Sequence, residues 1–438
     1  MKQKRNLALT LVVALTLSLS LLLSSCDFPW EVSTSIGDRY GNYDKDYGNG
    51  PDIRDETESV PTDKPIVKPS YDIDEEFPDE EVPTDDTDSG TTENNGDGGV
   101  THAASIGLRS VVSVYAGFGS NSSAGSGVIY KLNIVAGSAF IITNYHVVYH
   151  SSYGVSESIN CYLFGMESSE YAIPATFVGG SPNYDIAVLR IDDSKVMRAA
   201  GARGSITAAS LANSDYVFPG QSAIAIGNPN ASGISVTSGI VSVDSEQLSI
   251  QSSTGSGYVQ LRVIRIDTAV NSGNSGGGLF NGYGEIIGIV NAKIASTSVE
   301  NIGYAIPSNV ARAIADNIID YCYGTDCKSV MRAMLGVTVT VASLSTSYDE
   351  DTGRIERFEE VSVYEVSAGG LADGIFEVGD IIKRVDIGAQ SFSITRQHHL
   401  IDAMLDARVG DKVSFTLVRD GKEMTFSAVI TDDCLTAY

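Results

Sequence analysis

The sequence contains little cysteine and histidine, and far fewer basic than acidic residues. Its 438 residues include five cysteines and five histidines, with neither a Cys-x-x-Cys pair nor a His-Glu-x-x-His segment, so these zinc signatures are missing. The 29 lysines and arginines are outnumbered by 55 acidic residues, giving a net charge of −26, which argues against nucleic acid as a partner. We therefore expect no metal, no other cofactor and no nucleic-acid binding.

The N-terminus has the pattern of a bacterial export signal. A cationic segment from Met1 to Arg5 precedes an uncharged, mostly apolar run from Leu7 to Leu23, and Leu23-Ser24-Ser25-Cys26 resembles a lipobox. Residues 1–26 are therefore predicted to be a lipoprotein signal peptide. Lipid on Cys26 would hold the exported protein to the outer face of the cell membrane; an uncleaved anchor helix is the alternative.

Residues 27–100 have the composition of a disordered acidic linker. They contain 22 acidic and 5 basic residues, together with many of the prolines and glycines. Such a segment repels itself and has too little apolar surface to offset the entropy of ordering. It is either a spacer that holds the folded part away from the membrane or a solvated tail with no function of its own.

From about Ala104 the sequence consists of short β-rich runs separated by glycine and serine. This pattern favours a closed barrel or a sandwich. Helical spacing follows Pro307, with Ser308 as the expected N-cap and Gly324 beyond the end. After Lys328 a second, α+β unit of about 100 residues begins. Its expected elements are a helical segment from His399 to Ala407 and strands over 412–419 and 423–429, joined by the hairpin signal Asp420-Gly421.

Four cysteines remain after Cys26, an even number that suits an oxidising compartment. Cys322 and Cys327 are separated by a turn-forming segment and could pair locally, although free buried thiols explain them equally well. The state of Cys161 and Cys434 is left open.

The sharpest motif is Asn271-Ser272-Gly273-Asn274-Ser275-Gly276-Gly277-Gly278. A serine hydroxyl needs a neighbouring base and donors placed where negative charge develops on the attacked carbonyl. Glycines allow a tight turn around Ser275 and leave the peptide N–H groups of Gly273 and Ser275 accessible as an oxyanion hole. Ser275 is therefore the candidate nucleophile. The alternative is that the motif is only a polar loop that connects two strands.

The base and its orienting carboxylate are chosen by position. His146 directly follows the strand-like Phe140-Ile141-Ile142, and Asp185 opens another apolar strand, with Asp267 as the competing carboxylate. Asp185 is preferred because the order His, Asp, Ser matches chymotrypsin-type enzymes. An α/β-hydrolase elbow fits the spacing of Gly273 to Gly277, but such an elbow runs from a strand into a helix, whereas glycines and another strand follow Ser275.

These segments resemble the HtrA (Deg-type) family of serine proteases. Thr143-Asn144-Tyr145-His146-Val147, Asp185 to Leu189 and Asn271 to Gly277 are similar to the three family motifs around the triad. The resemblance implies a mostly β fold, in which a chymotrypsin-type double six-stranded β-barrel over 101–325 precedes an α+β PDZ domain over 329–432. It also implies cleavage of misfolded or unfolded exported proteins by a homotrimer, with the chaperone-like binding of such chains by an inactive site as the alternative.

The resemblance also assigns further site residues. The oxyanion hole would comprise the backbone N–H groups of Gly273, Asn274 and Ser275, and the specificity pocket Ala269, Asn291 and Ala292, which favours small or medium apolar side chains. In the PDZ domain, Leu335-Gly336-Val337 would hold the C-terminal carboxylate of a peptide. Two departures from the family pattern are Gly278, where proline is usual, and a polar insertion from Ser343 to Glu360 near the expected peptide groove.

Overall fold

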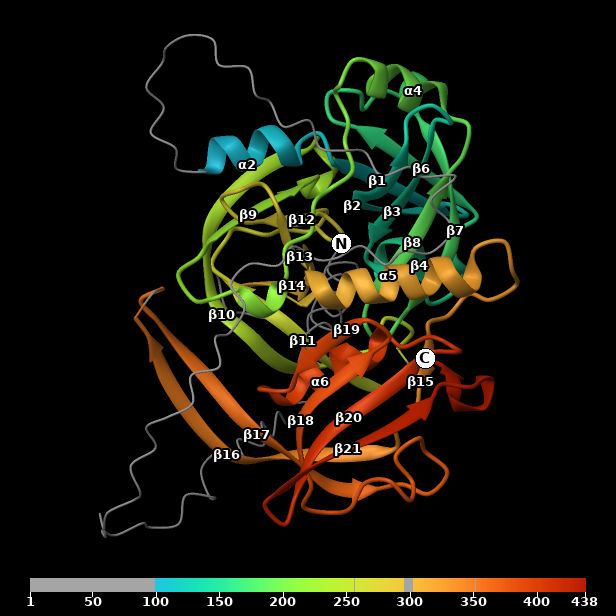
Figure 1. The fold of residues 1–438 in the computed structure, drawn as a ribbon. Helices are drawn as coiled ribbons and strands as arrows, with labels where there is room; N and C mark the ends of the chain where they lie inside the picture. Colours follow the sequence, from blue (N-terminus) through green and yellow to red (C-terminus); the bar gives the residue numbers. More distant parts are fainter. Residues whose placement is uncertain (1–98, 256, 295–301, 351) are drawn as a thin grey trace, which may run out of the picture. The chain divides into compact units, whose positions relative to one another are not determined.

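The computed structural model describes residues 99–438 except 256, 295–301 and 351. The predicted signal peptide, its Cys26 and the linker up to residue 98 lie outside the described residues. The described chain is mostly β, as predicted (Figure 1). In this part of the chain, every helix is too short or too polar to cross a membrane.

Two closed barrels of six antiparallel strands each follow one another along the chain. The first has the order β1-β2-β3-β8-β7-β6, and every second residue of β1 (Val112, Val114, Ala116) is buried in its interior, as the two-residue period of a strand requires. Its strands are β1 (Val111–Phe118), β2 (Asn121–Asn133), β3 (Ser138–Thr143), β6 (Ser158–Leu163), β7 (Ile173–Ser181) and β8 (Ile186–Ile191).

The second barrel has the order β10-β11-β14-β13-β12-β9 and encloses a core of its own around Ile264, Ile266 and Leu279. Ile226, Phe280 and other buried residues form a further core together with residues of the first barrel. The strands are β9 (Ser222–Gly227), β10 (Ser235–Gln251), β11 (Tyr258–Ile266), β12 (Gly278–Phe280), β13 (Ile286–Val290) and β14 (Gly303–Pro307). The predicted double barrel is confirmed.

Helices α5 and α2 both pack on the barrels. Helix α5 (Ser308–Cys322) covers the expected helical segment, but the prediction that Ser308 caps it is wrong. Pro307 occupies the cap position, and the Ser308 hydroxyl donates to the carbonyl of Ala212 instead, because the helix start is buried against the second barrel. Helix α2 (Val100–Gly107) was not predicted; it begins within one residue of the expected domain start at 101, and its Gly107 packs against Ile226 and Phe280.

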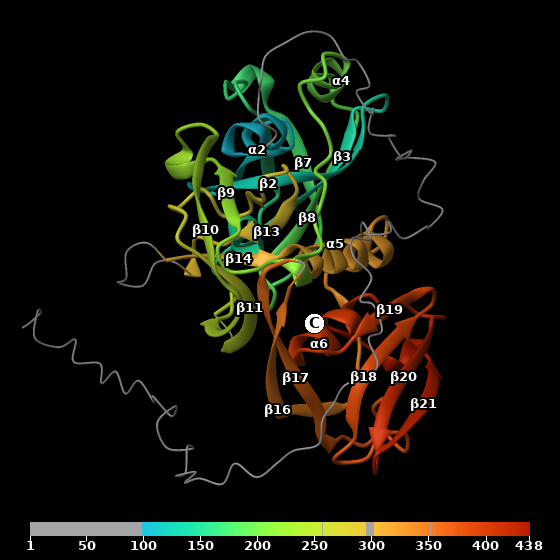
Figure 2. The same cartoon turned by 60° about the vertical axis from the view of Figure 1, so that its left-hand side comes forward.

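The C-terminal domain is a six-stranded sheet of order β16-β17-β18-β20-β21 with β19 paired to β18. Helix α6 (Gln397–Leu405) packs Leu400, Ala403 and Met404 into a core separate from those of the barrels, and it lies on the side of the sheet toward α5 (Figure 2). The strands are β16 (Val337–Asp349), β17 (Arg354–Val366), β18 (Ile381–Ile387), β19 (Gln390–Ser393), β20 (Lys412–Arg419) and β21 (Lys422–Val429).

Two local predictions in this domain have clear outcomes. Asp420 and Gly421 both have positive φ, 50° and 73°, the backbone that a tight two-residue hairpin between twisted strands requires. The polar segment from Ser343 to Glu360 is not a separate loop: it extends β16 and β17 into one long hairpin.

Cys322 and Cys327 form a disulfide, whereas Cys161 and Cys434 are free.

Short elements complete the described chain. They are α3 (Tyr145–Val148), β4 (Tyr149–His150), β5 (Gly154–Val155), η1 (Ser169–Tyr171), α4 (Lys195–Ala202), η2 (Ser214–Tyr216), η3 (Pro229–Ala231), β15 (Met331–Ala333), η5 (Asp432–Cys434) and β22 (Leu435–Ala437).

Candidate active site

His146 lies in the single turn α3, immediately after β3 of the first barrel. The turn is joined to the residue that opens β8. The side chain of Asn144 donates to the backbone carbonyl of Asp185 at 2.9 Å, and the N–H of Tyr145 donates to the same oxygen at 3.1 Å. Because β3 and β8 are neighbours in the barrel, two residues far apart in the sequence come together at one strand end.

Asp185 is almost completely buried, with 2% of its surface exposed, and its carboxylate accepts four hydrogen bonds. His146 provides two, from Nδ1 at 2.6 Å and from its backbone N–H at 3.0 Å. Ser253 Oγ and Asn291 Nδ2 provide the others, each at 2.8 Å. Burial alone would raise the pKa of Asp185, but the charge of His146 and these hydrogen bonds outweigh it and lower the pKa, so the carboxylate is ionised at neutral pH.

The competing carboxylate is excluded by its position. Asp267 Oδ1 accepts the backbone N–H of Ile240 at 2.6 Å, which ties it to strand β10 rather than to His146. The choice of Asp185 over Asp267 thus has a geometric basis in addition to the order of residues along the chain.

Ser275 lies in the turn before β12, and Ser126 of the first barrel holds this turn in place. Ser126 Oγ donates to the carbonyl of Gly273 at 2.7 Å, and its backbone N–H donates to the carbonyl of Ser275 at 2.8 Å. Gly276 has a φ of 86°, and a Cβ there would lie 2.2 Å from the Ser126 carbonyl oxygen. Only glycine fits this close approach of two backbones.

The three backbone N–H groups that were expected to form the oxyanion hole differ in their hydrogen-bond partners. The N–H of Asn274 donates to the carbonyl of Asn271 at 3.0 Å, so it is already used inside the turn. Among the described residues, the N–H groups of Gly273 and Ser275 have no such partner. These two are the donors that remain available for a developing oxyanion.

The candidate nucleophile Ser275 is not hydrogen-bonded to His146 in this structure. Ser275 Oγ accepts the backbone N–H of Ala292 at 3.2 Å, and within the described part of the chain no hydrogen bond joins it to His146. In structures without substrate, such catalytic hydrogen bonds are often long or poorly aligned. A rotation of the Ser275 side chain is therefore needed before proton transfer.

The three residues expected in the specificity pocket also make contacts that support the site. Asn291 was assigned to the pocket wall, but it is fully buried and its amide holds Asp185. Ala292 contacts Ser275 Oγ through its backbone, and the Ala269 carbonyl accepts the hydroxyl of Thr237 at 2.8 Å. Sequence reasoning missed Ser126, Ser253 and Asn291 as supports of the site because isolated serine and asparagine residues carry no distinguishing pattern.

In the C-terminal domain, the predicted carboxylate-binding loop leads into the edge strand β16, whose first residue is Val337. Gly336 has a φ of 75°, and a Cβ there would lie 2.8 Å from the Cα of Gly370, so a glycine is required for the loop to pass this neighbour. One backbone position of β16 is already engaged, because Gln397 Nε2 of α6 donates to the Val339 carbonyl at 2.9 Å.

Comparison with known proteins gives consistent similarities. Residues 125–289 match the family model of the trypsin-like peptidase domain. A "Serine protease Do-like HtrA" of Lactococcus lactis subsp. cremoris is 35% identical over 317 residues, which cover 69% of this chain and 70% of that protein. The "Periplasmic serine endoprotease DegP" of Salmonella typhimurium is 33% identical, over 69% of this chain and 55% of that protein.

A solved structure is similar in fold as well. The "HtrA-type protease AlgW with tripeptide" has 28% sequence identity and a TM-score of 0.50, and the match covers 77% of this chain and 98% of that one.

Proposed function

Because this chain belongs to the HtrA family of trypsin-like serine proteases, we propose that Ser275, His146 and Asp185 form the triad with which it cleaves unfolded exported proteins. The chain is a serine endopeptidase of protein quality control. The observation that carries the triad assignment is the 2.6 Å hydrogen bond between His146 Nδ1 and the buried carboxylate of Asp185, in a site to which both barrels contribute.

Each residue of the proposed active site has its own role in acyl transfer. Ser275 Oγ attacks the carbonyl carbon of the substrate while His146 Nε2 takes its proton, and the N–H groups of Gly273 and Ser275 stabilise the oxyanion. The C–N bond then breaks, and the leaving amine takes the proton from His146. A water molecule repeats both steps on the acyl-enzyme and releases the new carboxylate. The ionised Asp185 stabilises the imidazolium throughout.

One observation favours a second function, chaperone-like binding by an inactive site. Ser275 Oγ accepts from Ala292 rather than donating to His146. A protein that rests in this state could hold unfolded chains without cutting them until a ligand reorders the turn.

The first test is hydrolysis of unfolded β-casein by the full chain and by Ser275→Ala, together with labelling by a fluorophosphonate. We expect labelling at Ser275 in the wild-type chain, and a loss of casein cleavage of more than about 10⁴-fold in the variant. Cleavage that survives the substitution would refute the triad. Casein binding without labelling or cleavage by the wild type would favour the chaperone-like function.

We further propose that the C-terminal domain is a PDZ domain that binds the C-termini of substrates. Support comes from the glycine turn at Leu335-Gly336-Val337 and from the position of β16 at the sheet edge, where a peptide can add as a further strand. The contact of Gln397 with Val339 must open for a peptide to use that carbonyl. The trimer implied by the family resemblance stays a prediction.

We also propose that lipid on Cys26 anchors the protein outside the cytoplasm, with the acidic segment as a spacer. Cys26→Ser should move the protein from the membrane fraction to the soluble fraction, measured by cell fractionation. A Cys434→Ser variant controls for the loss of a thiol. If Cys26→Ser stays with the membrane, an uncleaved apolar helix is the anchor instead.

A further inference from the structure

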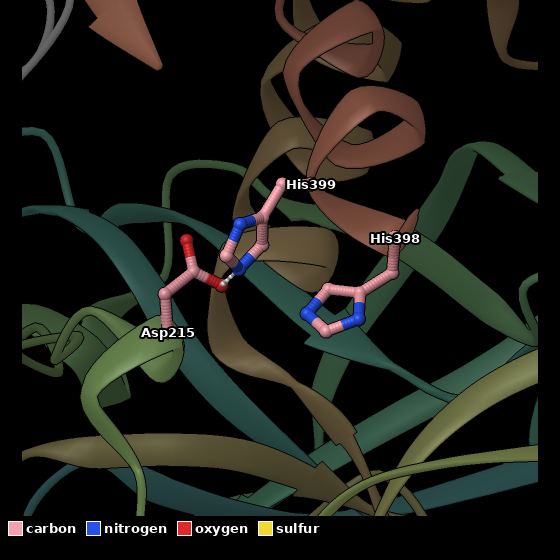
Figure 3. Close-up of side chains that lie close together, drawn as sticks. All are labelled: Asp215, His398 and His399. Carbon is pink, nitrogen blue, oxygen red and sulfur yellow. Dashed lines mark ion pairs between the residues drawn. The ribbon is translucent and has the colours of Figure 1, made fainter. Parts of the chain in front are cut away.

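Three side chains that can bind a metal ion converge where the C-terminal domain meets the second barrel (Figure 3). Asp215 comes from η2, before β9, whereas His398 and His399 come from the first turn of α6. One ligand atom from each residue lies within 4.8 Å of the other two. The residues are far apart in the sequence, so a search for metal motifs does not detect them.

The geometry is close to that of a bound zinc ion. His399 Nε2 lies 3.9 Å from Asp215 Oδ1, and each imidazole in Figure 3 directs one nitrogen toward the Asp215 carboxylate. Tetrahedral zinc with bonds of about 2.0–2.1 Å keeps its ligand atoms about 3.4 Å apart. Small side-chain rotations therefore suffice to close the site around an ion.

The other nitrogen of each ring has a partner that can orient it. His398 Nδ1 lies 3.4 Å from Ser245 Oγ, and His399 Nδ1 lies 3.3 Å from Thr395 Oγ1. These contacts hold the orientation of both rings, and the Thr395 N–H also donates to His399 Nδ1 at 3.4 Å.

The carboxylate is oriented as well. Asp215 Oδ2 accepts from Asn309 Nδ2 at 3.1 Å, which directs Oδ1 to the histidines.

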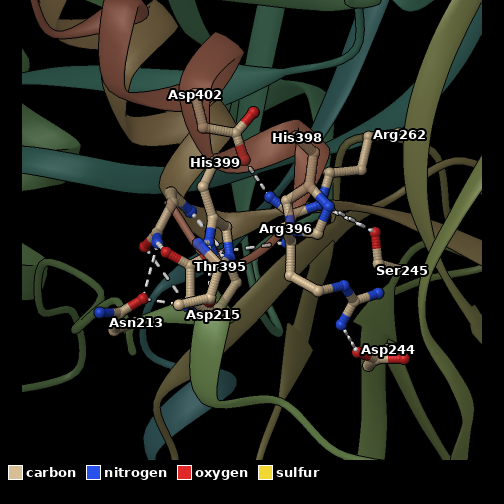
Figure 4. Close-up of polar contacts among 12 residues, drawn as sticks. Asn213, Asp215, Asp244, Ser245, Arg262, Thr395, Arg396, His398, His399 and Asp402 are labelled. Atoms are coloured by element: carbon tan, nitrogen blue, oxygen red, sulfur yellow. Dashed lines mark hydrogen bonds and ion pairs between the residues drawn. The ribbon is translucent and has the colours of Figure 1, made fainter. Parts of the chain in front are cut away.

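The guanidinium groups around the cluster are each paired with a carboxylate. Arg262 lies nearest, 3.4 Å from Asp215 Oδ1, but its main partners are Asp402 and Ser245 (Figure 4). Arg396 is paired with Asp244. Arg357, which also acts on the His398 ring, pairs with Glu359 at 2.9 Å.

We propose that Asp215, His398 and His399 bind one Zn²⁺ ion, with a solvent molecule as the fourth ligand. Two imidazoles and a carboxylate are a donor set that suits zinc. The ion links α6 of the C-terminal domain to η2 of the second barrel, so metal binding stabilises the docking of one domain on the other. The site is separate from the proposed triad and does not depend on it.

The test measures zinc binding to the full chain, carrying Ser275→Ala to prevent self-cleavage, after treatment with a chelator. Equilibrium dialysis with elemental analysis should give about one Zn²⁺ per chain. Loss of an outer partner of a metal site weakens binding about 10–100-fold, so His399→Asn and Asp215→Asn, which each remove a direct ligand, should weaken it by at least about 100-fold. His102→Asn, at an exposed histidine of α2, is the matched control and should bind as the parent does.

A second readout separates this site from adventitious binding. Co²⁺ in place of Zn²⁺ should produce the visible absorption of a tetrahedral ion, and His399→Asn and Asp215→Asn should each remove it while circular dichroism shows an unchanged fold. Zinc binding that survives both substitutions but is lost in His146→Gln would locate the ion at the triad and overturn the proposal. So would the absence of stoichiometric binding at micromolar zinc.

Discussion

At the scale of single residues, the arrangement around Asp185 is the feature on which the chemistry depends. The residue belongs to the first barrel, yet two of the four donors to its carboxylate, Ser253 and Asn291, come from the second barrel. The Asp185 carboxylate therefore has its full set of hydrogen bonds only when both barrels are assembled. Asn291 acts through Asp185 and is a positioning residue.

Asn291→Ala should lower kcat more than it raises KM. The substitution removes a hydrogen-bond donor to the Asp185 carboxylate, whose charge stabilises the imidazolium of His146. A hydrogen bond to an ionised group contributes about 1.5–3 kcal/mol, so we expect a loss of about 10–100-fold in kcat/KM, read from peptide hydrolysis. Asn281→Ala, at a buried asparagine in the turn between β12 and β13, is the matched control. An equal loss in both variants would indicate a general effect on folding.

At the scale of elements, the turn that carries Ser275 is shaped by contact with the first barrel. Gly276 is surrounded by the Ser126 carbonyl and by Thr143 Oγ1, which a Cβ would approach to 2.2 and 2.4 Å. Because the neighbouring atoms include backbone, they cannot move aside at low cost. The requirement for glycine thus comes from tertiary contact as well as from a φ of 86°.

Gly276→Ala should abolish fluorophosphonate labelling of Ser275 and lower kcat/KM by more than about 100-fold, since the turn must shift. Gly324→Ala is the matched control, with a similar φ of 73° but no atom within 4 Å of its Cβ. It should cost about 1 kcal/mol in the free energy of unfolding and leave hydrolysis unchanged. Normal labelling in Gly276→Ala would contradict the close contact seen here.

At the scale of the whole described molecule, charged side chains join the C-terminal domain to the protease part. Arg312 of α5 pairs with Asp406 at 2.6 Å, and Arg408 pairs with Asp320 of α5 at 2.8 Å. Arg312 and Asp406 are both largely buried, so each neutralises a charge that would otherwise be costly to desolvate.

Asp406→Ala should weaken this docking, because it leaves the buried Arg312 with the more distant Asp316 at 3.5 Å as its acidic partner. Removal of one partner of a buried pair costs about 3–5 kcal/mol. The measurement is the rate of limited proteolysis in the 323–331 connection, with the exposed Asp433→Ala as control. Equal protease resistance in both variants would show that the pair does not hold the domains together.

Much of the fold and the catalytic set could be predicted from the sequence, because strand alternation and the glycine turns are local properties. The strand over 412–419, the Asp420-Gly421 hairpin and the double barrel agree with the structure. Helix α2 was not predicted, because it gains its stability from packing against Ile226 and Phe280 rather than from a pattern of its own.

The sequence by itself determined the family, the two-barrel architecture and the three residues proposed for the triad, since each is encoded in short motifs and their order. Only the tertiary structure decided that Asn291 holds Asp185, that the N–H of Asn274 is already engaged, and that Asp215 meets His398 and His399. The physical reason is that single asparagines, aspartates and histidines acquire their partners through chain segments folded together from distant positions. Neither their identity nor their spacing along the chain carries that information.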